Sequence, residues 1–129
     1  MIKAHELRVG NWINVLHPYT KEWTFDKVKG MTIRNIEENP EHELITENLQ
    51  PIDLTPEILE KCKRFGRTLI NGEDCFFNGD DIIVRAKDMY LFLHNEVDGS
   101  VWGIRRIEHV HEFQNLILDL TGEELIINL

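Results

Sequence analysis

The sequence lacks the features of secreted and membrane proteins. Its cysteines are Cys62 and Cys75 alone, too few for a disulfide scaffold. No apolar run approaches the roughly 20 residues that a membrane-spanning helix needs. Residues 1–10 contain no apolar core of signal-peptide length. We therefore expect a cytoplasmic protein with reduced thiols and no membrane contact.

Positive charge is also scarce. The 14 lysines and arginines stand against 23 aspartates and glutamates, which gives a net charge of −9. Broad binding to phosphate backbones or anionic lipids demands clustered positive charge. The composition therefore disfavours nonspecific binding of nucleic acid, although a local basic patch remains compatible with it. The length of 129 residues is enough for a domain with its own hydrophobic core.

Catalytic motifs are missing as well. The sequence contains no Gly-x-Ser-x-Gly element, no phosphate-binding glycine loop and no dinucleotide fingerprint. Cys62 falls on the apolar side of a predicted helix and Cys75 starts a strand beside Phe76, so both are interpreted as small core residues rather than nucleophiles. We predict no catalytic residue and no cofactor, and a hydrolase ranks far below a binding protein.

Histidines and acids give little support for a metal site. His109 and His111 would share one face of a strand, with His94 nearby, but in a helix residues two apart point away from each other. Asp81 is followed by Arg85-Ala86-Lys87, but the second acid that a two-metal nuclease has before the lysine is absent. Most acidic pairs fall at predicted turns, where Asp and Asn shape the backbone; the pairs are Glu73-Asp74, Asp80-Asp81 and Glu123-Glu124. We predict no bound metal.

The C-terminal stretch from Glu108 to Ile127 has the clearest periodicity. Apolar residues recur there at helical spacing, and mostly acidic residues fall on the opposite side. Thr121-Gly122 should end the helix, because glycine accepts the left-handed conformation common at helix ends. Glu123–Leu129 is then predicted to form a short strand. The apolar positions are Val110, Phe113, Leu116, Ile117 and Leu120, and the polar ones are Glu108, Glu112, Asn115 and Asp119.

Short strands dominate the beginning of the chain. The segments Trp12–Leu16, Glu22–Val28 and Met31–Ile36 are rich in β-branched or aromatic residues and are separated by turn residues. They predict a small curled sheet of SH3-like character, whether or not the strands close into a barrel. The polar and acidic segment Glu37–Gln50 is interpreted as the joint between this lobe and the remainder.

A capped helix and a meander are predicted for the middle of the chain. The Thr55 hydroxyl can cap the helix, Pro56 suits its first position, and Gly66 ends it. Short strands then alternate with hairpin turns such as Asn71-Gly72 and Asn78-Gly79. The predicted strands are Thr68–Ile70, Cys75–Phe77, Asp81–Arg85, Met89–His94 and Val101–Ile107.

These elements together predict an α+β fold. Residues 1–50 form the SH3-like lobe. Residues 51–129 form the capped helix, the antiparallel meander, a C-terminal helix packed on that meander and a short final strand. This second part is expected to make one compact unit.

Three blocks of the sequence carry a family resemblance. They are ELRVGN at Glu6–Asn11, IDLTPEILEKC at Ile52–Cys62 and VHEFQNLILDLTGEEL at Val110–Leu125. In this order they resemble a family of small uncharacterised proteins common in Bacteroidetes genomes and their phages. The resemblance implies no activity, cofactor or catalytic residue. The third block has Glu112 and Phe113 where the family pattern has Gln and Leu, and Ile-Leu-Asp in place of its Tyr-Phe-Ala run.

Two groups of side chains are candidate binding residues. A polar stripe on the last helix either binds the backbone of a partner or, as we favour, satisfies buried carbonyls of the strand that follows the helix. A basic cluster could bind single-stranded nucleic acid together with Trp23, Phe25 or Tyr19 on a nearby sheet; a solvated helix end is the favoured interpretation. The stripe comprises His111, Gln114 and Asn115, and the cluster comprises Lys61, Lys63, Arg64 and Arg67.

The sequence favours a non-enzymatic accessory or protein-interaction protein of a bacterium or its mobile element. The expected partner is another protein, or a second copy of the chain through an unpaired sheet edge. The alternative is a nucleic-acid-binding module that uses the SH3-like lobe and the Lys61–Arg67 basic cluster. Nucleic acid is possible but is the less favoured partner, because few cations are available to neutralise phosphates.

Overall fold

The structure is a computed structural model that describes residues 6–17, 19–30, 33 and 49–129. The chain divides into two compact units. The first comprises residues 1–53 and 109–124, and the second comprises residues 54–108 and 125–129. The division differs from the predicted boundary at residue 50, because residues 109–124 group with the N-terminal segment.

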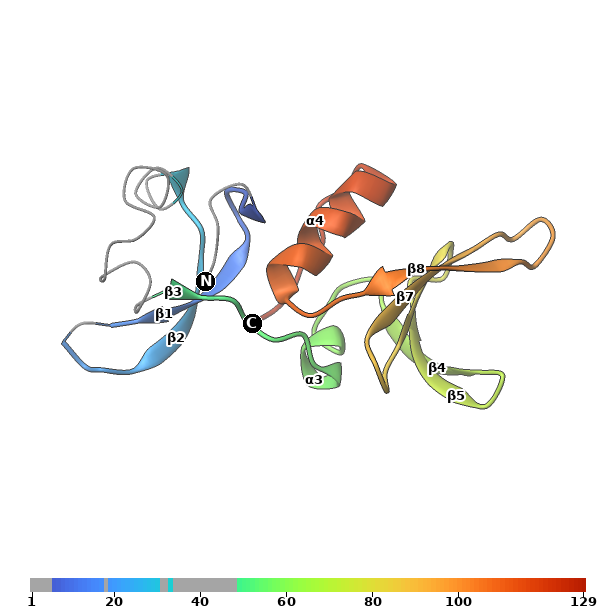
Figure 1. The fold of residues 1–129 in the computed structure, drawn as a ribbon, viewed down its shortest axis with the longest axis horizontal. Helices are drawn as coiled ribbons and strands as arrows, with labels where there is room; N and C mark the ends of the chain where they lie inside the picture. The colour runs from blue at the N-terminus through green and yellow to red at the C-terminus, as the bar shows by residue number, and fades with distance from the viewer. Residues whose placement is uncertain (1–5, 18, 31–32, 34–48) are drawn as a thin grey trace. The chain divides into compact units, whose positions relative to one another are not determined.

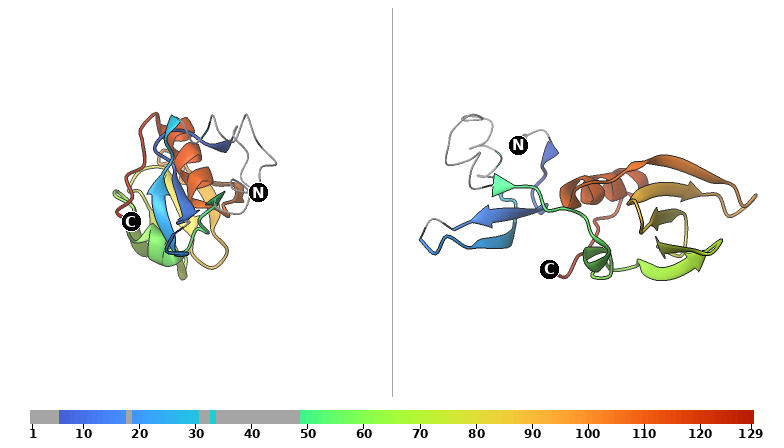
Figure 2. Two further views of the ribbon diagram at one scale, coloured as in Figure 1. Left: turned by 90° about the vertical axis from the view of Figure 1, so that its left-hand side faces the viewer. Right: turned by 60° about the horizontal axis from the view of Figure 1, so that its bottom comes forward.

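The first unit contains a three-stranded antiparallel sheet in the order β2-β1-β3. Its strands are β1 (Trp12–Leu16), β2 (Trp23–Lys27) and β3 (Leu49–Gln50), drawn from blue to green in Figures 1 and 2. The first two were predicted. Of the predicted strand Met31–Ile36, Ile33 is helical and the other residues lie outside the described part. β3 supplies the third strand instead, and the described strands form an open sheet rather than a closed barrel.

One face of this sheet covers a small apolar core. Ile13 is buried from β1, and it is joined by Leu7 and Val28 from the flanking segments. Val15, Ile33 and Leu49 pack against these residues from the edge of the cluster. Because side chains alternate between the two faces of a strand, the packing of Ile13 and Val15 on this core leaves Trp12, Asn14 and Leu16 on the opposite face.

Helix α4 (Val110–Thr121) also belongs to the first unit. It ends as predicted at Gly122, which has φ 75° and whose amide donates to the Leu118 carbonyl oxygen at 2.8 Å. Its buried residues are Val110, His111, Phe113, Gln114 and Ile117. The predicted apolar face was therefore partly wrong: Leu120 is exposed and Leu116 only half-buried, because the buried stripe turns toward the polar pair His111 and Gln114.

The second unit begins with a helix that is shorter than predicted. α3 (Pro56–Leu59) is capped by Thr55, whose hydroxyl accepts a hydrogen bond from the Ile58 amide at 3.3 Å. The helix does not extend to Gly66, which instead starts a strand. Arg64 has φ 72°, a left-handed conformation that breaks the helical path between these points.

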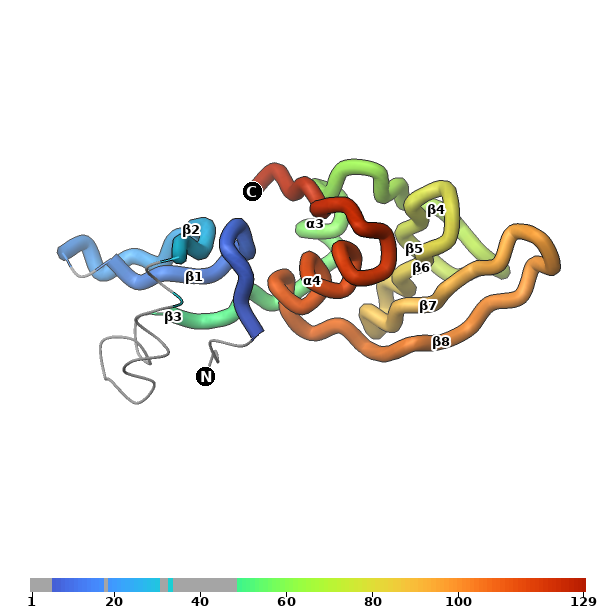
Figure 3. Tube along the Cα trace, turned by 90° about the horizontal axis from the view of Figure 1, so that it is seen from above, coloured from blue at the N-terminus to red at the C-terminus, as the bar shows by residue number. Residues whose placement is uncertain are grey.

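A five-stranded antiparallel meander makes up the rest of the second unit. Its order β4-β5-β6-β7-β8 follows the chain, and Figure 3 shows β7 and β8 side by side. Left-handed residues occur at the predicted turns, at Asn71, Gly72, Gly79 and Gly99, so the turn chemistry sets the register. The strands are β4 (Gly66–Ile70), β5 (Glu73–Phe77), β6 (Ile82–Arg85), β7 (Tyr90–His94) and β8 (Val101–Arg106).

The predicted final strand is reduced to a single bridge between Cys62 and Ile127. Two backbone hydrogen bonds flank it, from the Lys63 amide to the Ile126 carbonyl and from the Asn128 amide to the Lys61 carbonyl. The α+β class is confirmed by two antiparallel sheets with separate helices. Among the described residues, no helix combines the length and apolar character required to cross a bilayer.

Candidate interaction surfaces

The predicted polar stripe on α4 holds the N-terminal segment. The Gln114 Oε1 atom accepts a hydrogen bond from the Trp12 amide at 2.8 Å. The Asn115 side-chain amide donates to the Glu6 carbonyl oxygen at 2.7 Å, and its oxygen accepts from Arg8 and Asn11 at 2.7 and 2.9 Å. Both side-chain amides therefore have a structural role, because they bind the segment before β1. The partners lie before β1 or at its start rather than in the segment that follows α4.

His111 completes the stripe without such bonds. Its side chain is almost fully buried, and neither ring nitrogen has a hydrogen-bond partner among the described residues. The nearest carboxylate oxygen, from Glu6, is 3.6 Å from Nε2. Burial lowers the pKa of His111 below its ordinary value of 6.5, although the carboxylates of Glu112 and Glu6 act in the opposite direction. The buried imidazole is therefore neutral near pH 7.

His109 and His111 lie closer together than helical spacing predicted. Their rings are stacked, with centroids 5.7 Å apart and planes 8° from parallel. The expectation that they point apart was wrong because His109 is the N-cap of α4 and has extended backbone angles. Its ring also contacts Glu112 at 2.6 Å and Asp53 at 3.8 Å. In the described part of the chain, no group of three or more His, Cys, Asp or Glu side chains is placed to hold a metal ion.

The basic cluster is partly neutralised within its own unit. Arg67 donates to Asp74 at 2.6 Å and to Glu60 at 2.6 Å, and these two carboxylates raise the pKa of the guanidinium. Arg67 also lies over the Phe76 ring. Lys61, Lys63 and Arg64 are exposed, but they lie after α3 rather than at the end of a longer helix. The cluster therefore offers less free positive charge to phosphates than the sequence indicates.

The cysteines and turn acids occupy structural positions. Both cysteines are buried and free, and burial raises the pKa of the Cys62 thiol to about 12, which disfavours the thiolate that a nucleophile requires. The Asn78 side-chain oxygen accepts from the amides of Asp80, Asp81 and Ile82. These bonds close the turn before β6, which is a role that the predicted turn chemistry anticipated.

The strand β8 is an exposed edge of the meander that the sequence reasoning did not single out. Among the described residues it pairs only with β7, so one side of its backbone has no partner strand. Trp102 is 66% exposed and Ile104 is 40% exposed, with Val101 exposed beside them. Large apolar residues flank Gly103 in the sequence, but a buried strand would show the same residues, so the sequence pattern did not indicate that β8 is an edge.

An open cleft of about 340 Å³ lies at the start of β8. Trp102 lines it together with His94 and the carboxylate side chains of Asp80, Asp81 and Glu96. Asp98, in the adjoining turn, bonds to Ser100, and these hydrogen bonds lower the pKa of its carboxyl. The end of the meander next to Val101 is therefore negatively charged near neutral pH.

Comparisons of the chain with protein-family models, with curated proteins and with solved structures find no match. The resemblance of the three sequence blocks therefore stays a prediction. What the structure adds is that two of the blocks meet: Arg8 of the first block bonds to Asn115 and Glu124 of the third.

We predict that Asn115→Ala lowers the free energy of unfolding by about 2 kcal/mol, because the Glu6 carbonyl and the donors on Arg8 and Asn11 lose their partner. Asn128→Ala, at an exposed position, should change it by less than about 0.5 kcal/mol. Chemical denaturation of both variants measures the difference. Equal losses would contradict the structural part assigned to Asn115.

The buried His111 predicts a pH dependence of stability. The unfolded chain takes up a proton on this residue as the pH falls through about 6.5, whereas the folded chain stays neutral to lower pH. Because the unfolded state then binds more protons, the free energy of unfolding should decrease as the pH falls from 7 to 5. His111→Leu should flatten part of this slope, whereas exposed His17→Gln should not. Denaturant titrations across this range provide the measurement, and an unchanged slope in the His111 variant would refute the assignment.

Proposed function

We propose that the protein is a non-enzymatic interaction protein that associates through strand β8, with a second copy of the chain as the partner. The observation that supports this proposal is the combination of an unpaired strand edge with exposed Trp102 and Ile104. Unpaired edges present free backbone groups that recruit another strand. An accessory role in a bacterium or its phage fits such a protein and belongs to the same proposal.

Antiparallel pairing of two β8 strands would be self-complementary in shape. If the twofold axis passes near Gly103, Trp102 of one copy lies opposite Ile104 of the other, and the reverse pair forms across the axis. Aromatic and β-branched residues are favourable cross-strand partners. The exposed apolar surface at the middle of β8 would then be covered by the same surface of the second copy.

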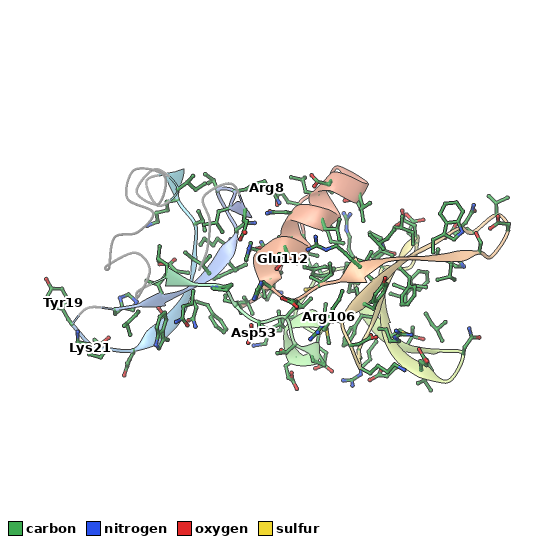
Figure 4. The ribbon with its side chains drawn as sticks, in the orientation of Figure 1. Arg8, Tyr19, Lys21, Asp53, Arg106 and Glu112 are labelled. Atoms are coloured by element: carbon green, nitrogen blue, oxygen red, sulfur yellow. The ribbon has the colours of Figure 1, made fainter. Side chains whose placement is uncertain are left out.

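The charges along β8 support the same pairing. The strand begins beside the acidic residues Glu96 and Asp98 and ends at Arg106, whose position at the end of the strand is labelled in Figure 4. Antiparallel pairing brings the acidic beginning of one strand near the basic end of the other. A parallel arrangement would place like charges together, which is unfavourable.

A bulge limits the length of the pairing. The register between β7 and β8 shifts between Leu91 and Phe92, so Ile104 has no direct partner on β7. Bulges twist edge strands and commonly protect them from uncontrolled pairing. A short, specific contact around Gly103 is therefore the form of association that this edge supports.

The nucleic-acid alternative receives less support from the residues on which it was based. Of its four basic side chains, Arg67 is held by Glu60 and Asp74. Binding of phosphate groups would have to compete with these two carboxylates. The alternative through the Lys61–Arg67 cluster therefore ranks below strand association.

Sedimentation equilibrium at several protein concentrations tests the proposal. We expect the unmodified chain to dimerise reversibly, and the double variant Trp102→Lys, Ile104→Lys to remain a monomer, because it places like charges opposite each other. The matched control is Leu69→Lys, which changes an exposed apolar residue on β4, the other edge of the same sheet.

The control variant should dimerise like the unmodified chain. A monomer at every concentration would contradict self-association. Loss of the dimer in the Leu69 variant alone would show that the contact involves β4 and not β8. Circular dichroism of all three proteins separates a lost contact from a lost fold.

A further inference from the structure

The three-stranded sheet of the first unit has a second face that the core does not use. Direct cross-strand pairs place Trp12 opposite Lys27, Asn14 opposite Phe25 and Leu16 opposite Trp23. Trp23 is 40% exposed and Phe25 is 47% exposed. The Lys27 ammonium lies 5.2 Å from the centre of the Trp12 ring, which confirms that these two side chains share the face. We refer to these six residues as the aromatic face.

The charge of the aromatic face is opposite to that of the whole chain. Within the three described strands this face carries Lys27 and no carboxylate, because Asp26 alternates to the other side of β2. Lys21 lies beside Tyr19 at the tip of the β1–β2 hairpin, as Figure 4 shows, and both are exposed. Although the protein has a net charge of −9, the lysines beside this aromatic surface can attract an anionic ligand to it.

One exposed polar side chain on the same face can bond to a ligand. Gln50 of β3 lies directly opposite Asn14 of β1, and its side chain is exposed. Side-chain amides present both donors and acceptors, which are the groups needed to bond to the edge of a nucleobase.

From these observations we infer that the aromatic face binds a short single-stranded nucleic acid. Trp23 and Phe25 would stack on successive bases, Gln50 would bond to a base edge, and Lys27 and Lys21 would approach the phosphates. Sheets that present aromatic rings next to cations bind single strands in this way. The site is independent of the Lys61–Arg67 cluster and of association through β8.

The chemistry separates this ligand from other extended ligands. A proline-rich peptide would use the rings but has no need of the lysines, and a neutral oligosaccharide would likewise leave the positive charge unused. A single strand of nucleic acid uses the rings, the Gln50 amide and the lysines together. With few lysines near the face, the salt dependence of binding should be shallow.

Fluorescence anisotropy with labelled ten-nucleotide oligothymidine and oligouridine, at near-physiological salt, tests the inference. We expect binding that Trp23→Ala and Phe25→Ala each weaken by about tenfold. Trp23→Phe and Phe25→Tyr should retain binding, because a ring is still available to stack. The matched control is Trp102→Ala, which removes an exposed tryptophan from the other sheet and should change nothing.

Lys27→Gln should weaken the affinity and reduce its dependence on salt, whereas Lys63→Gln should not. Several results would overturn the inference. These are no binding at several hundred micromolar protein, equal loss in the Trp102 variant, and displacement of the oligonucleotide by a neutral oligosaccharide or a proline-rich peptide. Thermal unfolding of each variant shows whether the sheet remains folded.

Discussion

The first unit depends on a few hydrogen bonds made by two side-chain amides of α4. Gln114 is buried and Asn115 is half-buried. Asn115 bonds to three groups of the segment 6–11, and Gln114 bonds to the amide of Trp12 and the carbonyl of Gly10. These contacts join positions that are more than 100 residues apart in the chain. Because an unpaired buried polar group is costly, the amides fix where the N-terminal segment lies against α4. The β1 strand follows directly from that segment, so the sheet starts from a fixed point.

This geometry gives a physical account of two sequence blocks that resemble a family pattern. Glu6–Asn11 and Val110–Leu125 supply the two sides of the same hydrogen-bond network, with Arg8 also paired to Glu124. Residues with this role preserve a fold and give no information about a ligand. The surfaces suited to binding lie elsewhere, on β8 and on the aromatic face. Exposure and charge on these two surfaces support the proposed functions, and the residues that carry the resemblance do not contribute to them.

Local sequence signals were enough to predict the meander, because each strand is bounded by turn residues with left-handed angles, as at Asn71-Gly72 and Gly99. They were not enough for α3, where the apolar spacing of Ile58, Leu59 and Cys62 predicted a helix as far as Gly66 although the helix ends at Leu59. The α4 face was misjudged because His111 and Gln114, both polar, are buried by tertiary contacts that no periodicity reveals. The edge position of β8 was also beyond a local pattern, since it depends on which strands have neighbours.

The backbone amides of β8 report directly on association through this strand. Hydrogen–deuterium exchange of the unmodified chain should be compared at low and high protein concentration. If two β8 strands pair, the β8 amides that face away from β7 exchange more slowly at high concentration, because new hydrogen bonds protect them, while those of β4 do not change. Exchange in β8 that is independent of concentration, or protection that appears in β4 instead, would contradict the account.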